Sequence, residues 1–314
     1  MRTRTYVALA AGLVLAALAA TRVVGNDYYF FAGYVVLQYV VLATAWNILG
    51  GYTGYVNFGS AAFFAIGAYT TIALIRLAEV PLYLSIPAAG VVCGLIGLAA
   101  GYLTLRLRGV YFAIATLALA IVLETFVANW DFVGGATGSI VMRPKEAPLF
   151  DSYVKFLFCV MAALAVAAVS VARYLETSRL GRGLAAIRDD EQAAECSGVP
   201  TLRLKLLSAT LSGALMGLAG APFPYYVTYV DPPSAFNLDY AVNAVAMPMV
   251  GGTQTWLGPV VGALLLGTLQ QVATVTISSE LNLLIVGLVL VGFVILAPEG
   301  IVGQVRRVLA RRRR

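Results

Sequence analysis

The chain has 314 residues, of which 61% are hydrophobic and only 11% are charged. Its mean hydropathy is +0.87, and apolar runs near twenty residues recur, which excludes an ordinary soluble protein and indicates a polytopic membrane protein. There is no histidine, so the commonest general base and metal ligand are missing. The three cysteines, Cys93, Cys159 and Cys196, have no metal or redox spacing. We therefore expect no catalytic residue, no metal site and no cofactor in this chain.

The apolar runs predict helices, because lipid offers no hydrogen-bond partners and each span must satisfy its own backbone. We predict an all-α fold: one transmembrane helical bundle of about ten spans, with residues 1–314 forming a single domain. The predicted spans are residues 6–24, 30–50, 57–77, 82–105, 109–130, 155–175, 204–226, 238–252, 256–275 and 281–297.

Basic residues set the expected topology, since cytoplasmic segments of membrane proteins are rich in lysine and arginine. Ten spans place both basic termini on the cytoplasmic side, together with sixteen of the 21 Lys and Arg residues. A nine-span alternative, with 238–275 as one kinked helix, would export the arginine-rich tail, although the sequence leaves open a re-entrant 238–275. The sixteen residues are Arg2, Arg4, Arg106, Arg108, Arg173, Arg179, Arg182, Arg188, Arg203, Lys205, Arg306, Arg307 and Arg311 to Arg314. The net charge of +6 therefore indicates topology and anionic lipid, not nucleic acid.

The first span allows two interpretations. Residues 1–20 have the basic start, apolar stretch and small-residue end of a signal peptide. The apolar run nevertheless reaches spanning length before Arg22, which favours a retained span. Cleavage would move the N-terminus outside and leave the other spans unchanged.

Glycines are patterned at helical spacing, which lets helix backbones approach closely in lipid. The stripes indicate packing within one subunit or a seam with a second membrane subunit. They are Gly90, Gly94, Gly97 and Gly101; Gly213, Gly217 and Gly220; and Gly258, Gly262 and Gly267.

Two stretches, 47–69 and 248–267, share one pattern: an apolar helix, Gly-Gly, a short polar stretch and a glycine-spaced helix. We name Gly50–Asn57 the first break and Gly251–Thr255 the second break. Paired interruptions in two halves of a membrane chain often mark a transport site, because unwound backbone offers polar groups near the midplane. With the polar residues of the neighbouring spans, the candidate pathway residues are Asn47, Gly51, Asn57, Ser60, Thr116, Glu124, Asn129, Gly251 and Gly252.

Glu124 is the only ionisable residue well inside a predicted span, where a charge requires a partner or a function. It is either a structural carboxylate that bonds a neighbouring helix or water, or a proton-transfer group.

Residues 182–200 are unusually charged for this chain. Asp189 can cap a helix with Gln192 at its third position, and Gly198 then supplies the stop. We predict a short surface helix over about 189–197 in a cytoplasmic loop, about 176–203. A helix this short is marginal in water, so it requires support from the membrane domain or a partner.

This loop, "GRGLAAIRDDEQAAECSGV", and the following "RLKLLSATLSGALMGLAGA" resemble the cytoplasmic coupling segment and next helix of branched-chain amino-acid ABC importer permeases, the larger of two paired subunits. Residues 51–70, 106–120 and 250–263 also resemble that family, in the same order. Many relatives carry histidine after Gly59, where this chain has Ser60. The resemblance assigns coupling to an ATPase to Arg182, Arg188, Asp189, Glu191, Glu195 and Gly198.

The resemblance implies a multi-pass protein of the bacterial inner membrane that acts with a paralogous permease, two ATP-binding subunits and an extracytoplasmic solute-binding protein. The absence of a Walker A pattern fits ATP hydrolysis in a separate subunit. The expected substrate is a leucine-like amino acid, with urea, short amides and aromatic acids left open. The alternative is a proton-coupled secondary transporter that uses Glu124 and needs no ATPase.

Overall fold

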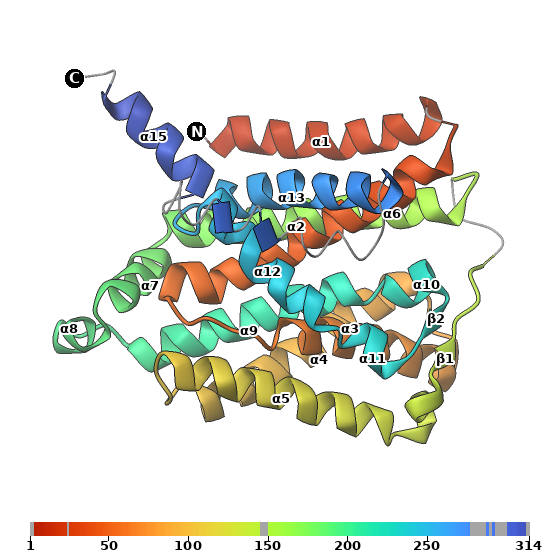
Figure 1. The fold of residues 1–314 in the computed structure, drawn as a ribbon, viewed down its shortest axis with the longest axis horizontal. Helices are drawn as coiled ribbons and strands as arrows, with labels where there is room; N and C mark the ends of the chain where they lie inside the picture. The colour runs from red at the N-terminus through yellow and green to blue at the C-terminus, as the bar shows by residue number, and fades with distance from the viewer. Residues whose placement is uncertain are drawn as a thin grey trace.

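The computed structural model describes residues 3–23, 25–144, 150–276, 287–288, 291–292 and 300–311. In this part of the chain, long helices pack side by side, and most of them run roughly along the long axis of one bundle, which is horizontal in Figure 1. The predicted all-α class is confirmed. The strands among the described residues are β1 (Ser139–Ile140) and β2 (Tyr229–Val230), a short antiparallel pair.

The long helices coincide with the predicted apolar runs. They are α1 (Thr3–Val23), α2 (Asp27–Thr53), α3 (Ser60–Ala78), α4 (Leu82–Thr104), α5 (Val110–Ala128), α6 (Tyr153–Thr177), α9 (Thr201–Gly220), α12 (Leu238–Gly251) and α13 (Leu257–Thr276). Shorter elements connect or follow them: η1 (Asp131–Val133), η2 (Gly135–Thr137), α7 (Arg179–Asp189), α8 (Glu191–Cys196), α10 (Phe223–Val227), α11 (Pro232–Ala235) and α15 (Gly300–Arg311).

Seven segments of the described chain are long and apolar enough to cross a membrane, counting Thr201–Val227 as one. The apolar part of α1, Ala8–Val23, is shorter, and α12 has 14 residues. The predicted separation of 238–275 into two helices is confirmed, because α12 ends at Gly251 and α13 begins at Leu257. The tenth predicted span, 281–297, falls largely outside the described residues, so the count of ten is approximate.

Helix α2 is the centre of the bundle. It contacts α6, α9, α12 and α13. Of its most apolar 18-residue stretch, 72% is buried inside the protein. Helix α5 differs, since only 17% of its most apolar 18-residue stretch is buried. Most of the α5 surface is therefore free to meet lipid or another protein.

The glycine stripes pack within this chain. A Cβ atom on Gly97 of α4 would lie 2.8 Å from the carbonyl oxygen of Ala209 on α9, and one on Gly217 of α9 would lie 2.8 Å from that of Ala89 on α4. These contacts are closer than real Cβ atoms allow, so glycine permits the backbones of α4 and α9 to touch.

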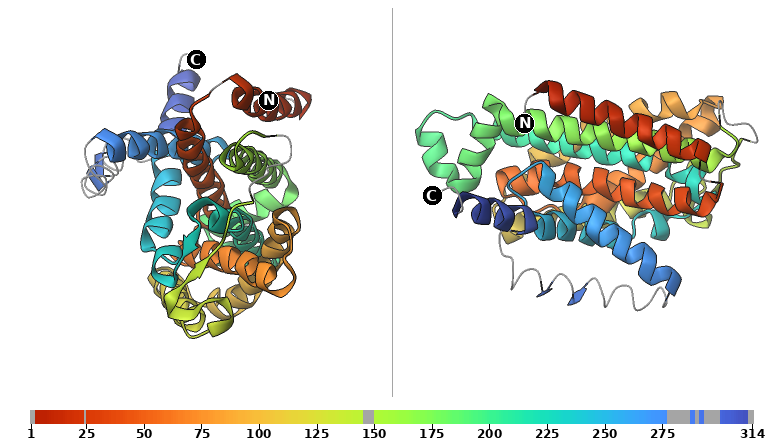
Figure 2. Two further views of the ribbon diagram at one scale, coloured as in Figure 1. Left: turned by 90° about the vertical axis from the view of Figure 1, so that its right-hand side faces the viewer. Right: turned by 90° about the horizontal axis from the view of Figure 1, so that it is seen from above.

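Both termini of the described chain lie at one end of the bundle, beside α7 and α8 (Figures 1 and 2). The first break lies at this end too, because it contacts α7 and α8, and so does the second break, because the next residue, Trp256, contacts the end of α6. Both breaks therefore lie toward one end of the bundle and not at its middle, where the sequence pattern placed them. We call this end of the bundle the α7–α8 end.

The opposite end is closed by short elements that side chains tie down. Arg76 of α3 donates hydrogen bonds to the Phe132 carbonyl oxygen at 2.7 Å and the Ser139 hydroxyl at 2.9 Å. Arg143 donates to the Tyr225 carbonyl oxygen at 2.7 Å. The β1–β2 pair and Arg143 therefore join the α5–α6 connection to the α9–α12 connection, and Arg76 joins the α5–α6 connection to α3.

Candidate functional site

The charged segment between α6 and α9 forms two helices that meet at Asp190. The Asp190 backbone is extended (φ −160°, ψ 111°), and its Oδ1 accepts hydrogen bonds from the backbone nitrogens of Gln192 (2.9 Å) and Ala193 (3.0 Å). The assignment of the cap to Asp189, in a single helix over 189–197, is wrong. Residues 179–189 already form α7, so only Asp190 has the extended backbone that an N-cap requires.

Helix α8 ends where the sequence predicts. Gly198 has φ +80°, and a Cβ atom there would meet nothing within 4 Å. A glycine is therefore favoured at position 198 by the left-handed backbone conformation, and not by a lack of space for a side chain. The backbone nitrogens of Gly198 and Val199 donate to the carbonyl oxygens of Glu195 (2.9 Å) and Ala194 (3.0 Å), which completes the turn.

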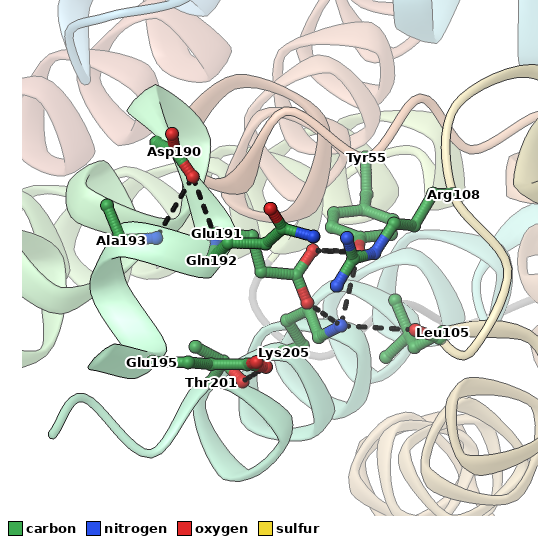
Figure 3. Close-up of polar contacts among 10 residues, drawn as sticks. All are labelled: Tyr55, Leu105, Arg108, Asp190, Glu191, Gln192, Ala193, Glu195, Thr201 and Lys205. Carbon is green, nitrogen blue, oxygen red and sulfur yellow. Dashed lines mark hydrogen bonds and ion pairs between the residues drawn. The ribbon is translucent and has the colours of Figure 1, made fainter. Parts of the chain in front are cut away.

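Glu191, the first residue of α8, is the centre of a polar network at the α7–α8 end (Figure 3). Its Oε1 lies 2.7 Å from Nζ of Lys205 on α9, and its Oε2 accepts a 2.6 Å hydrogen bond from the Tyr55 hydroxyl in the first break. Nε of Arg108, in the α4–α5 connection, lies 3.7 Å from Oε2. We call Tyr55, Arg108, Glu191 and Lys205 the Glu191 network.

The electrostatics of the network favour an ionised Glu191, whose side chain is 12% exposed. Burial by itself raises the pKa of this carboxyl, but hydrogen bonds from Lys205 and Tyr55 and the charges of Lys205 and Arg108 outweigh it, so the pKa lies below its usual value. Burial, followed by the hydrogen bond and charge of Glu191, raises the pKa of Tyr55 well above its usual value. Tyr55 therefore remains a hydroxyl donor to the carboxylate.

The other predicted coupling residues have different surroundings. Arg188 pairs with Asp189 at 3.2 Å, and its Cα lies 3.8 Å from where a Cβ on Gly54 would stand. The exposed Glu195 accepts a 2.7 Å hydrogen bond from the Thr201 hydroxyl. Arg182 and Asp189 are exposed. Glu191 thus acts inside this chain, whereas Arg182, Asp189 and Glu195 present charge at the surface.

The first break is ordered by hydrogen bonds. The Asn57 carbonyl oxygen accepts from Nε1 of Trp46 (2.8 Å), and Asn57 Oδ1 accepts from the Gly59 nitrogen (2.7 Å). The Phe58 nitrogen donates to the hydroxyl of Thr116 on α5 at 3.1 Å, and Ser60 donates to the Asn57 carbonyl oxygen at 3.5 Å. The structure therefore brings Asn57, Ser60 and Thr116 together.

The second break meets the first. A Cβ atom on Gly51 would lie 2.6 Å from the Thr253 carbonyl oxygen and 2.0 Å from Oδ1 of Asn47. Gly251 is equally constrained, because a Cβ there would lie 1.8 Å from the Gly258 carbonyl oxygen. The adjacent Gly252 has φ +115°. Gly51 therefore packs against Asn47 and the second break, whereas Gly251 packs against the start of α13.

Glu124 and Asn129 lie apart from this group, farther along α5. Asn129 Nδ2 donates to the Thr125 carbonyl oxygen at 2.8 Å, one turn back in the same helix. Glu124 is half-buried, two turns beyond Thr116 toward the opposite end.

A groove of about 820 Å³ opens at the α7–α8 end, between the first break, the α4–α5 connection and the two short helices. Tyr55, Arg108, Val110, Arg188 and Gln192 are among its lining residues. Its wall mixes charged and apolar groups, as a surface that meets a protein partner does.

Three residues that hold the breaks in place were not singled out from the sequence: Tyr55, Lys205 and Glu176. Lys205 was counted only as a topology marker, although it is a cation inside the apolar α9 pattern and is 5% exposed. Oε2 of Glu176, at the end of α6, accepts a 2.6 Å hydrogen bond from the Trp256 nitrogen. For Lys205 and Glu176, the sequence offered one signal: each is a charged residue that interrupts an apolar pattern close to the end of a span.

Over the described ranges no group of three or more His, Cys, Asp or Glu side chains is placed to hold a metal ion.

These features define a polytopic helical membrane protein with two glycine-rich breaks, one of which holds a charged segment between two spans. The chain belongs to the family described as the branched-chain amino acid transport system permease component, which it matches over residues 28–294.

Individual relatives have related descriptions. The chain is 28% identical over 293 residues to the high-affinity branched-chain amino acid transport system permease protein LivM of Salmonella typhimurium, covering 85% of this chain and 68% of the relative. LivM of Escherichia coli is 27% identical with the same coverage. The probable LivH permease of Methanocaldococcus jannaschii is 25% identical over 282 residues, covering 84% and 88%. No solved structure matches the chain.

Proposed function

We propose that this chain is the membrane-spanning permease subunit of an ATP-binding-cassette importer, and that it translocates branched-chain or other small hydrophobic amino acids. Family membership supports the transport role. The observation that carries the ATP-driven part is the α7–α8 segment, because its exposed charges face outward while Glu191 joins it to the first break. ATPase subunits that bind this segment would act on the pathway through it.

The chain acts in this proposal with a second, related permease. The relatives include both LivM and LivH permeases of high-affinity branched-chain amino acid transport systems, which supports a pair of unlike subunits. The low burial of α5 leaves a large helical surface for that partner. An extracytoplasmic binding protein delivers the substrate, and neither ATP nor another cofactor binds this chain.

The α7–α8 end faces the cytoplasm of a bacterium, with both termini on that side of the inner membrane. The concentration of basic residues in the segments at this end supports the orientation.

Proton coupling through Glu124 finds no support. Within the described part of the chain Glu124 makes no hydrogen bond or ion pair, and a relay needs a second titratable group.

Reconstitution of the chain with its paired permease, ATP-binding subunits and binding protein in proteoliposomes tests the proposal. Leucine uptake is expected to require ATP and to continue after an uncoupler collapses the proton gradient. Uptake that persists without ATP and stops with the uncoupler would overturn it. Mass spectrometry of the ligand held by the co-purified binding protein identifies the substrate.

A further inference from the structure

Lys205 is a buried cation whose three donor positions are all used. Its Nζ lies 2.7 Å from Glu191 Oε1, 3.1 Å from the Leu105 carbonyl oxygen and 3.2 Å from the Tyr55 hydroxyl. These acceptors belong to α8, to the residue that ends α4 and to the first break (Figure 3). One side chain therefore joins three connections of the bundle to α9.

The presence of a lysine and a glutamate at this buried contact requires an explanation. A buried ion pair loses much of its attraction to desolvation, and well-packed apolar residues of similar size often stabilise a fold as much. What an ammonium group adds is direction, because three hydrogen bonds fix three acceptors relative to one another. This arrangement suits segments that must keep their relative positions while they move.

The connection continues beyond Tyr55. Three residues later, the Phe58 nitrogen is bound to the Thr116 hydroxyl, and Asn57 is held by Trp46 of α2. A displacement of Tyr55 therefore reaches α2 and α5, the helices that carry Asn47 and Thr116. By contrast, Asp189 on the same segment has only its exposed contact with Arg188.

We propose that Lys205 and Glu191 are positioning residues of the transport cycle: they clamp α8 to the first break, so that movement of the α7–α8 segment is delivered to α2 and α5. This inference rests on the proposed function, since it supposes that an ATPase moves the segment.

The test compares Lys205→Met and Glu191→Gln with Asp151→Asn in the reconstituted complex. Asp151 is an exposed carboxylate just before α6, at the end of the bundle opposite α7 and α8. Co-purification of the ATPase subunits, ATP hydrolysis and leucine uptake are measured together. Both clamp variants are expected to retain the ATPase subunits but to lose about tenfold or more in leucine transported per ATP, as removing one member of a buried charge pair costs at least that much. Asp151→Asn is expected to keep the wild-type ratio.

The double variant Glu191→Gln/Lys205→Met separates clamping from general damage. Because Lys205→Met alone leaves the Glu191 carboxylate unpaired, the double variant is expected to fold better than that single variant yet to remain uncoupled. Recovery of coupling together with folding would overturn the proposal and make the pair merely structural.

A covalent link supplies the rescue. The Cβ of Arg188 lies 3.9 Å from where a Cβ on Gly54 would stand, within the range of disulfides. In a Lys205→Met background without native cysteines, Gly54→Cys and Arg188→Cys should form a disulfide that restores coupling when oxidised and loses it on reduction. Gly54 has φ +81°, where a side chain strains the backbone, so the same two cysteines in a chain with Lys205 intact measure the cost of that strain. A formed disulfide without recovery counts against the clamp, as does an unchanged ratio in both single variants. If the wild-type complex itself needs no ATP, the proposed function has failed instead.

Discussion

Glu176 and Trp256 are eighty residues apart in sequence, yet a carboxylate oxygen of Glu176 accepts a 2.6 Å hydrogen bond from the Trp256 backbone nitrogen. The bond joins the end of α6 to the residue that precedes α13. Backbone N–H groups at a helix start lack partners within the helix and attract negative charge. Glu176 therefore fixes the second break at the base of α7, as Glu191 fixes the first break at α8.

Replacing Glu176 with alanine is expected to lower the thermal unfolding midpoint of the purified chain. The loss corresponds to about 1.5–3 kcal/mol, the usual contribution of a hydrogen bond to a charged group. Glu195→Ala is the matched control, because the Glu195 side chain is exposed and accepts its hydrogen bond from Thr201, six residues away in the same connection. Differential scanning fluorimetry in detergent measures both, and equal shifts would show that the Glu176 contact adds no stability.

The cap of α8 gives a second comparison between adjacent residues. Asp190→Ala removes two hydrogen bonds to backbone nitrogens and is expected to destabilise the segment by about 1 kcal/mol. Asp189→Ala removes an ion pair with Arg188, and the Asp189 side chain is 72% exposed. This change is therefore expected to have little effect on the stability of the segment. Proteolysis within 179–200 should accelerate in Asp190→Ala alone. Faster cleavage in Asp189→Ala would instead place the cap there.

The misplaced cap shows where sequence reasoning reaches its limit. Asp189 and Asp190 are equivalent in type and both precede helix-forming residues, so the local pattern permits either. The choice depends on Leu184 and Ile187, which are buried and extend α7 to Asp189. Burial of that face is a tertiary effect, and it overrides the preference for one short helix.

The glycine stripe of α4 provides a third test. A Cβ on Gly97 would lie 2.8 Å from a backbone oxygen of α9, whereas one on Gly94 would lie 3.4 Å from the Ala214 methyl group. Gly97→Ala is therefore expected to destabilise the chain by about 1–3 kcal/mol, as overpacking does. Gly94→Ala should be tolerated, since ordinary van der Waals contact remains. Unfolding midpoints in detergent check the difference, and a Gly94→Ala loss as large as that of Gly97→Ala would contradict the packing.

Helical spacing predicted these stripes because small residues at one face are a local property of a sequence. The Glu191 network was not predictable in the same way. Tyr55, Leu105 and Lys205 are separated by fifty residues or more, and no periodic pattern connects them. Their meeting depends on which spans are neighbours, and the α4–α9 contact decides that.

The lowered pKa of Glu191 predicts a pH dependence. The groups that face it are Lys205, Tyr55 and Arg108, so Glu191 is the carboxylate of this network. Because the folded pKa lies below the unfolded value, the ionised form stabilises the docked segment above that value, and the stabilisation is lost as pH falls through the folded pKa. The difference in unfolding midpoint between wild type and Glu191→Gln should be constant above about pH 6 and shrink below about pH 4.5. A difference independent of pH would show that the charge contributes nothing.

The exposed Cys196, the last residue of α8, offers a test in the native chain. Cys93 is buried in α4 and Cys159 lies within the α6 span, so a water-soluble maleimide should react chiefly at Cys196. If the α7–α8 end is cytoplasmic, inside-out membrane vesicles should label and right-side-out vesicles should not. The reverse pattern would invert the proposed topology.

Binding of the ATPase subunits should then protect Cys196. Its position beside Glu195 places it on the charged surface assigned to that partner, and the desolvated centre of a protein interface excludes a water-soluble reagent as it excludes water. The labelling rate at Cys196 should therefore fall roughly tenfold or more in the assembled complex. A cysteine introduced at Thr137, which lies in η2 at the opposite end, should label at the same rate with and without the ATPase. If Cys196 stays equally reactive in a complex that contains both ATPase subunits, they bind elsewhere, and α8 is not the contact through which ATP hydrolysis reaches this chain.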